Sequence, residues 1–129
     1  MANIFNKIDS LGLDYKLEIK EYDWFNHEKV DGKYKTIKGL HILIPINDRF
    51  TFSIIHQQNE CTGEFYEDDD GKWQWELAIK DDEFKCLWDI DKNDVDPTRF
   101  FVDGVVHFLD EDEVIELVSK FYNELHDRI

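Results

Sequence analysis

Carboxylates are the side chains of this chain whose type and spacing could do chemistry. They cluster in three consecutive runs, Glu67 to Asp70, Asp81 to Glu83 and Asp110 to Glu113, and in the more widely spaced stretch from Asp89 to Asp96. Closely spaced carboxylates can hold a divalent cation, exchange protons in acid–base catalysis, or present negative charge to a partner. Each use needs a different arrangement in space, so each run has to be weighed against the elements that carry it.

The best match to a metal-binding loop is the stretch DIDKNDVDPTRF. Asp89, Asp91 and Asn93 occupy the first, third and fifth positions of a calcium loop of the helix-loop-helix type. The match ends there, because Asp94 stands where glycine is needed and Phe100 stands where a bidentate glutamate is needed. We therefore interpret this stretch as a solvated acidic loop. The run EDDDG fits a tight turn that points its carboxylates into water.

The histidines and cysteines show no catalytic or zinc-binding spacing. Cys61 and Cys86 lie in no CxxC or HxxxH pattern, and His56 precedes Cys61 without an identifiable third group. His41 and His56 are expected on neighbouring strands, as histidines hydrogen-bonded within a sheet. GxGxxG, P-loop and GxSxG motifs are also absent from the sequence. We therefore predict no catalytic residue, no metal and no cofactor, and a protein that is not an enzyme.

Negative charge is the strongest global feature of the 129 residues, which carry a formal net charge of −15. Twenty acidic and only five basic residues lie between Glu60 and Glu116, and the charges elsewhere balance. This excess argues against direct binding of nucleic acid or an anionic membrane, because phosphate needs the opposite charge. It favours a basic protein as the partner.

A composition that is 42% hydrophobic and 15% aromatic can supply the core of one folded domain spanning residues 1–129. No apolar run approaches the 18 or so residues of a membrane span, and the N-terminal stretch lacks a signal-peptide pattern. We expect a cytoplasmic protein.

Hydrophobic periodicity predicts the elements that must position the carboxylates. Ile4, Phe5, Ile8 and Leu11 have helical spacing, and Gly12 is placed to end that helix. Alternating apolar residues predict strands over 14–25, 33–46, 49–58, 72–80 and 83–90, with a short strand over 63–67 paired to 72–80 and a hairpin within 99–109. The turns are expected at Asp31-Gly32, Asn47-Asp48 and Asp103-Gly104. Gly39 suggests a bulge or bend, and Pro45 a strand end.

The C-terminal helix has the clearest signal. Asp110 is predicted as its N-cap, and Glu113 completes a capping box. One apolar stripe then follows at helical spacing, formed by Val114, Ile115, Val118, Phe121, Tyr122, Leu125 and Ile129. We predict an α+β domain, in which an antiparallel and mostly sequential sheet carries a short N-terminal helix and a long C-terminal amphipathic helix packed on one face.

Aromatic residues are numerous, and their first use is in the core. Trp73, Trp75 and Trp88 fall at strand positions predicted to be buried. Trp24, Phe25, Tyr66 and Tyr122 are our candidates for an exposed remainder. Exposed aromatics ringed by acids make an interface, because the rings anchor a partner and the charges steer it.

The partner-binding surface is predicted to comprise Glu67, Asp68, Asp69, Asp70, Asp81, Asp82, Glu83, Asp110, Glu111 and Asp112. If the turns gather at one edge of the sheet, these runs form a single negative rim. The hypothesis is a non-enzymatic inhibitor that binds a basic nucleic-acid-binding protein, such as a nuclease or a defence effector, by mimicking nucleic-acid charge. The alternatives are a solvated acidic surface, a small-ligand or metal-binding domain with a pocket between sheet and helix, and an adaptor subunit.

In general character the chain is small, acidic, single-domain and poor in cysteine. In this it resembles phage anti-defence proteins such as anti-CRISPRs and DNA mimics, and equally bacterial immunity proteins that neutralise nuclease toxins. The resemblance implies a place in the cytoplasm of a bacterial cell, with the gene carried by the bacterium or by a phage. The oligomeric state stays open.

Overall fold

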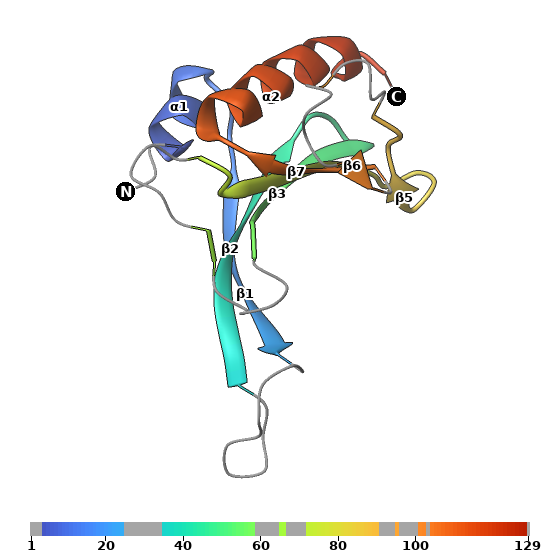
Figure 1. Cartoon of the computed structure of the whole chain (residues 1–129). Coiled ribbons are helices and arrows are strands. Elements are labelled where there is room, and N and C mark those ends of the chain that lie inside the picture. The colour runs from blue at the N-terminus through green and yellow to red at the C-terminus, as the bar shows by residue number, and fades with distance from the viewer. Residues whose placement is uncertain are drawn as a thin grey trace.

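One antiparallel sheet carries two helices on one of its faces (Figure 1). The computed structural model describes residues 4–24, 35–58, 65–66, 72–90, 95, 101–102 and 104–128. In chain order the elements are α1 (Ile4–Ser10), β1 (Lys16–Trp24), β2 (Lys35–Pro45), β3 (Phe50–His56), β4 (Trp75–Asp81), β5 (Cys86–Leu87), β6 (Phe101–Val102), β7 (Val105–Leu109) and α2 (Glu111–Leu125). The α+β architecture predicted from the sequence is confirmed.

The strands follow the order β1-β2-β3-β4-β7-β6, and the short β5 pairs with β4 as well. Neighbours along the chain are therefore neighbours in the sheet for the first four strands, as predicted. The hairpin about Asp103-Gly104 is confirmed by the pairing of β6 with β7, and Gly104 has the positive φ of 83° that its turn requires. Asp103 itself lies outside the described residues.

The β1–β2 pair is longer than the rest of the sheet. β1 pairs with β2 from Lys16 opposite Leu43 to Trp24 opposite Lys35, whereas β3 pairs only with the last residues of β2, from His41 to Pro45. The far halves of β1 and β2 therefore continue as a two-stranded ribbon away from the body (Figure 1). The turn predicted at Asp31-Gly32 lies outside the described residues.

The core fills the space between the sheet and the helices. Phe50, Phe52 and Ile54 alternate along β3, within the strand predicted over 49–58, and are fully buried. The buried side of α2 comprises Val114, Leu117, Val118, Phe121 and Leu125, while Ile115 and Tyr122 of the predicted stripe are half-buried. Its capping box is complete, because the Asp110 carboxylate accepts the Glu113 N–H at 2.7 Å and Glu113 accepts the Asp110 N–H at 3.3 Å.

The smaller helix α1 buries Ile4 and Ile8. It ends at Ser10, and Gly12 follows with a φ of 72°, the left-handed conformation predicted there. The β2–β3 connection falls at Asn47-Asp48 and β2 ends at Pro45, both as predicted. The sequence therefore placed most element ends correctly.

Two predictions about residues 72–90, which contain three of the tryptophans, are wrong. Trp75 is buried in the core, but Trp73 is 54% exposed and lies with a φ of 58° in the turn before β4. The strand predicted over 83–90 is reduced to β5, because a turn over residues 82–85 leaves Phe84 exposed. Trp88 is half-buried and packs edge-on against Phe50, with ring centroids 5.3 Å apart.

Two local pairing predictions are also corrected. Phe65 forms an isolated antiparallel bridge with Gln58, beyond the end of β3, and does not pair with β4. Gly39 is not a bulge, because the β1–β2 register runs through it without a shift. The space above it is taken by Phe65, whose ring would lie 2.7 Å from a Cβ at Gly39.

Candidate functional site

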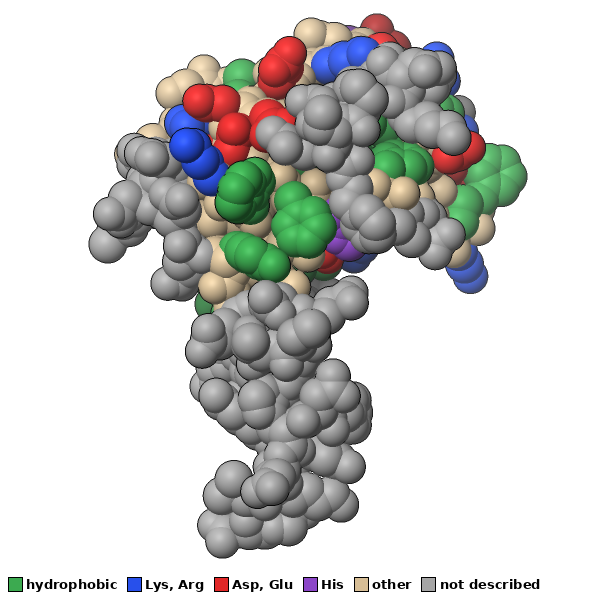
Figure 2. Space-filling view, in the orientation of Figure 1, with side chains coloured by type: hydrophobic (Ala, Val, Ile, Leu, Met, Phe, Trp, Pro, Cys, Tyr) green, Lys and Arg blue, Asp and Glu red, His purple; other side chains and the backbone are tan. Residues whose placement is uncertain are grey.

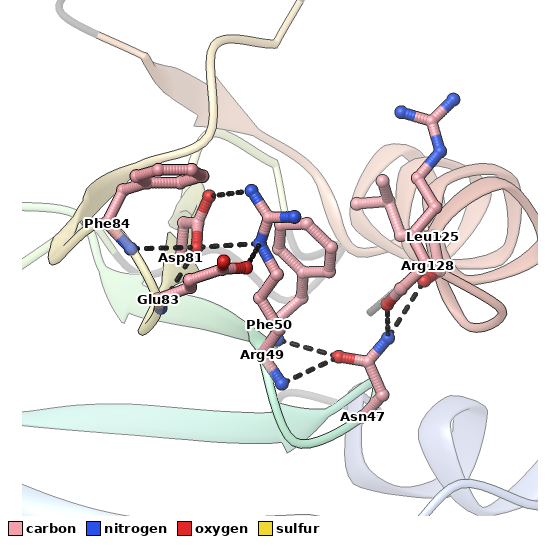
Figure 3. Close-up of polar contacts among 8 residues, drawn as sticks. All are labelled: Asn47, Arg49, Phe50, Asp81, Glu83, Phe84, Leu125 and Arg128. Carbon is pink, nitrogen blue, oxygen red and sulfur yellow. Dashed lines mark hydrogen bonds and ion pairs between the residues drawn. The ribbon is translucent and has the colours of Figure 1, made fainter.

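The β4–β5 connection turns tightly around a buried carboxylate. Asp81 is the last residue of β4, and its Oδ1 accepts the backbone N–H groups of Glu83 at 3.1 Å and Phe84 at 3.3 Å (Figure 3). In addition, the Asp82 N–H donates to the Arg49 carbonyl at 2.8 Å. Aspartate favours this geometry because its short side chain bonds the backbone two and three residues on. The turn is thus fixed from both of its sides.

Arg49, in the β2–β3 connection, holds the same turn through its guanidinium group. Its Nε and Nη2 donate to the two carboxylate oxygens of Asp81 at 3.0 and 2.8 Å, and Nε lies 3.2 Å from Glu83 Oε2. The guanidinium also lies over the rings of Phe50 and Phe84, at 4.7 and 4.8 Å from their centroids. The two-pronged bond holds the pKa of Asp81 below its usual value and raises the pKa of Arg49. Both groups therefore stay charged, and Arg49 is neutralised by its neighbours.

The supported turn presents acids and apolar side chains to solvent together. Asp82 and Glu83 are exposed, Phe84 is 66% exposed and Leu87 is 37% exposed. We call Asp82, Glu83 and Phe84 the acidic turn. In Figure 2 acidic and hydrophobic side chains lie together on the side of the molecule that carries β5. Its chemistry is that of a contact surface, with two charges beside a ring held in place.

Asn47 joins this region to the end of α2 (Figure 3). Its Oδ1 accepts the N–H groups of Arg49 and Phe50 at 2.9 and 2.8 Å, while its Nδ2 donates to the Leu125 carbonyl at 3.0 Å and to the carbonyls of His126 and Arg128. These are carbonyls at a helix C-terminus, which lack partners within the helix. The β2–β3 connection, the acidic turn and the end of α2 are therefore linked as one polar unit.

The third predicted run, Asp110 to Asp112, serves mainly the helix that it begins. The Asp110 carboxylate is engaged in the capping box. Glu111 is buried and lies 3.4 Å from Lys7 Nζ, and Asp112 accepts from Lys7 at 2.8 Å with its side chain 87% exposed. The bond with Asp112 raises the pKa of Lys7. This run fastens α1 to α2 and leaves one carboxylate, that of Asp112, in solvent.

The two described runs lie at opposite ends of α2. The Asn47 links place Asp81, Asp82 and Glu83 beside its C-terminus, whereas Asp110 to Asp112 form its N-terminus. A helix of 15 residues is about 22 Å long, so these runs do not merge into one rim. Glu67, Asp68, Asp69 and Asp70 lie outside the described residues, as do positions 91–94 and 96–100 of the calcium-like stretch.

A polar array on the face of the sheet opposite the helices escaped the sequence analysis. His41 Nε2 lies 2.7 Å from Ser53 Oγ, and His41 Nδ1 lies 3.6 Å from Glu18 Oε2. Acid, histidine and serine follow one another here as in hydrolases. However, His41 and Ser53 are only 1% and 5% exposed, so a substrate does not reach the Ser53 hydroxyl in this conformation. We interpret the array as a tie across β1, β2 and β3, which confirms His41 as a sheet histidine.

Other chemistry finds little support in the described part of the chain. No group of three or more His, Cys, Asp or Glu side chains that could hold a metal ion occurs among those residues. The helix–sheet interface, where the alternative hypothesis expects a pocket, is occupied by packed core side chains. The helices that the structure describes are too short or too polar to cross a membrane.

Comparison of the chain with protein-family models, with curated proteins and with solved structures finds no match to any of them.

Proposed function

We propose that this protein is a non-enzymatic inhibitor that binds a basic, nucleic-acid-handling protein, with the acidic turn as the described part of its contact surface. The observation that carries the proposal is the exposure of Phe84 next to the exposed acids Asp82 and Glu83, in a turn where the backbone N–H groups of all three residues are hydrogen-bonded. Aromatic side chains held rigidly at a surface lose little conformational freedom when a partner covers them.

The charge of the chain supports a basic partner. The net charge of −15 resides in the segment from Glu60 to Glu116, which includes the acidic turn. Arg49, which lies against the turn, already bonds Asp81 and Glu83. Lys85, exposed at the end of the same turn, offsets one of its negative charges, so the net charge of the whole segment carries the attraction. A surface of this sign attracts the positively charged groove in which a nuclease or defence effector holds phosphates. The inhibitor would occupy that groove in place of nucleic acid, in the cytoplasm where both are found.

Two carboxylates per turn are few for a nucleic-acid mimic, so the proposal includes further acids. Glu67 to Asp70 belong to the same acidic segment and are retained as partner-binding residues. Asp82 and Glu83 are retained from the second run, and Asp112 from the third. Asp81, Asp110 and Glu111 are assigned to support, because their carboxylates are engaged within the protein and none of these three residues is exposed, unlike Glu83 and Asp112.

The experiment is capture from lysate of the native host, using the immobilised protein and elution with increasing salt. We expect a basic nucleic-acid-binding protein to elute at moderate salt, because exposed charges are screened beyond about 8 Å at physiological ionic strength. A combined Asp82→Asn, Glu83→Gln and Phe84→Ala variant should lose the captured protein. The variant keeps Asp81 and Arg49, so its melting temperature serves as the check on folding.

The matched control is Glu116→Gln, which removes an exposed carboxylate of α2 that is not assigned to the contact surface. It should lower capture far less than the triple variant. Equal capture by wild type and triple variant would remove the acidic turn from the interface. A partner that is neutral, or that stays bound at high salt, would contradict the charge mechanism.

A further inference from the structure

The outer edge of β1 carries the features of a strand that accepts another strand. β1 lies at the end of the sheet, and no strand in the described ranges pairs with its outer edge. Its nine residues contain no proline, and their register with β2 has no bulge. Proline, bulges and very short length are the usual means by which proteins block a sheet edge. Among the described residues, the outer edge of β1 therefore lacks these three kinds of protection.

In the first part of β1, from Lys16 to Ile19, charged and apolar side chains alternate between the two faces. Leu17 lies opposite the buried Ile42 and Ile19 lies opposite Leu40, so both belong to the helix-covered face. Even so, Leu17 is 44% and Ile19 57% exposed, because the strand has a neighbour on one side only. On the other face, Lys16 Nζ lies 3.3 Å from Glu18 Oε1, and the two side chains are 71% and 38% exposed.

We infer that β1 pairs antiparallel with β1 of a second copy of this chain, with Leu17 on the two-fold axis. In this register Leu17 lies opposite the second copy's Leu17, and Tyr15 lies opposite its Ile19. Lys16 lies opposite the second copy's Glu18. Every apolar residue from 15 to 19 then meets an apolar residue, and every charge meets the opposite charge. Symmetry produces each unlike pair twice.

Neighbouring registers lack this match. A two-fold axis through a residue of the shared sheet sets that residue against itself, so an axis at Glu18 or Lys16 places like charges opposite each other. An axis at Ile19 places Leu17 opposite Glu21. The strand is therefore complementary to itself in one register, and this self-complementarity is why we assign the edge to a second copy and not to an unrelated strand.

The geometry of the charges strengthens the pair. Lys16 and Glu18 already approach each other along β1. Placing the same two residues of the second copy beside them, about 4.8 Å away, completes a square in which each positive charge has two negative neighbours. On the apolar face, Leu17 would contact Leu17 of the second copy and Ile19 would contact its Tyr15. Both side chains would then have a neighbour on the outer side of β1, where the single chain has none in its described residues.

The test is sedimentation of the full chain over low to high micromolar concentration at about 0.15 M salt, where the Debye length of about 8 Å screens the repulsion between two acidic chains. We expect wild type to shift from monomer to dimer. Lys16→Glu and Glu18→Lys should each raise the dissociation constant at least about tenfold, because every altered pair occurs twice. The Lys16→Glu/Glu18→Lys double variant restores unlike charges between the two copies and should recover most of the affinity that either single variant loses, although it also removes the contact of Glu18 with His41.

Leu17→Lys supplies a second route to the same conclusion, since it sets two positive charges on the axis and should give a monomer. Leu87→Lys is the matched control, an exposed leucine of β5 placed elsewhere, and should leave the dimer intact. Circular dichroism and the melting temperature confirm folding for each variant. A chain that stays monomeric at all concentrations overturns the inference, as does a dimer that survives Leu17→Lys or a double variant as weak as the single ones. These outcomes do not bear on the acidic turn, whose variants leave β1 unchanged.

Discussion

Asn47 is the side chain whose removal should cost the fold most for its size. Its amide accepts two backbone N–H groups of the β2–β3 connection and donates to the carbonyl of Leu125 at the end of α2. Replacing Asn47 by alanine removes these three bonds, together with those that Nδ2 shares with the carbonyls of His126 and Arg128. Each contributes about 0.5–1.5 kcal/mol to the free energy of unfolding. Because water replaces part of the loss at this half-buried site, we expect a decrease of about 2 kcal/mol.

The expected change in melting temperature follows from the size of the chain. At about 2.1 cal/mol/K per residue, the unfolding entropy of 129 residues is about 0.27 kcal/mol/K, so 2 kcal/mol corresponds to about 7 °C. Thermal unfolding followed by circular dichroism or calorimetry measures the shift. Hydrogen exchange should also quicken at the His126 and Arg128 amides, which bond back to Tyr122 and Leu125.

Asn47→Asp separates the two halves of this interaction. The introduced carboxylate keeps the acceptor for Arg49 and Phe50 but places a negative oxygen against helix carbonyls. At pH 7 the Asn47→Asp variant should lose as much stability as Asn47→Ala, or more. At acidic pH this loss should become smaller, because the introduced carboxylate gains a proton. A change below about 2 °C for Asn47→Ala, or an aspartate variant as stable as wild type at pH 7, would refute the role given to this side chain.

Three further substitutions test other parts of the structure by thermal unfolding. Asp81→Asn should lower the free energy of unfolding most near neutral pH. The difference from wild type should fade as the pH drops through the folded pKa of Asp81, which Arg49 holds below the usual 3.8. A difference independent of pH would contradict the ion pair. Asp110→Ala should cost about 1 kcal/mol through loss of the N-cap, and no change would exclude the capping box as a source of stability. Gly39→Ala should destabilise by about 1 kcal/mol because it meets the Phe65 ring, and Phe65→Ala in the same chain should remove most of that penalty, whereas additive losses would deny the contact.

The elements that sequence reasoning predicted well are those whose own residues determine them. The helix α2 has its cap at Asp110, its box partner at Glu113 and its apolar stripe in one continuous segment, so local signals suffice. Strand β3 alternates Phe50, Phe52 and Ile54, which leaves one face for the core. The failures occur where distant contacts decide. Phe65 takes the space over Gly39, and this cannot be inferred from the spacing of either residue.

The acidic surface was predictable in composition but not in arrangement. A run of aspartates in a sequence does not indicate which carboxylate will be buried. Asp81 is buried because it bonds Arg49, which lies 32 positions earlier in the chain. Phe84 follows the alternation of a buried strand, but the turn that Asp81 nucleates ends that alternation and exposes the ring. The array of Glu18, His41 and Ser53 depends on the register of three strands, which the sequence alone does not fix.

Competition between this protein and nucleic acid for the captured partner tests the proposed function most directly. The partner is loaded with a labelled DNA or RNA duplex and titrated with wild-type protein, and the bound label is measured at constant salt. We predict displacement of the duplex by wild type, and at least about tenfold weaker displacement by the combined Asp82→Asn, Glu83→Gln and Phe84→Ala variant. A complex that holds the partner, the duplex and this protein together would contradict the proposed inhibition.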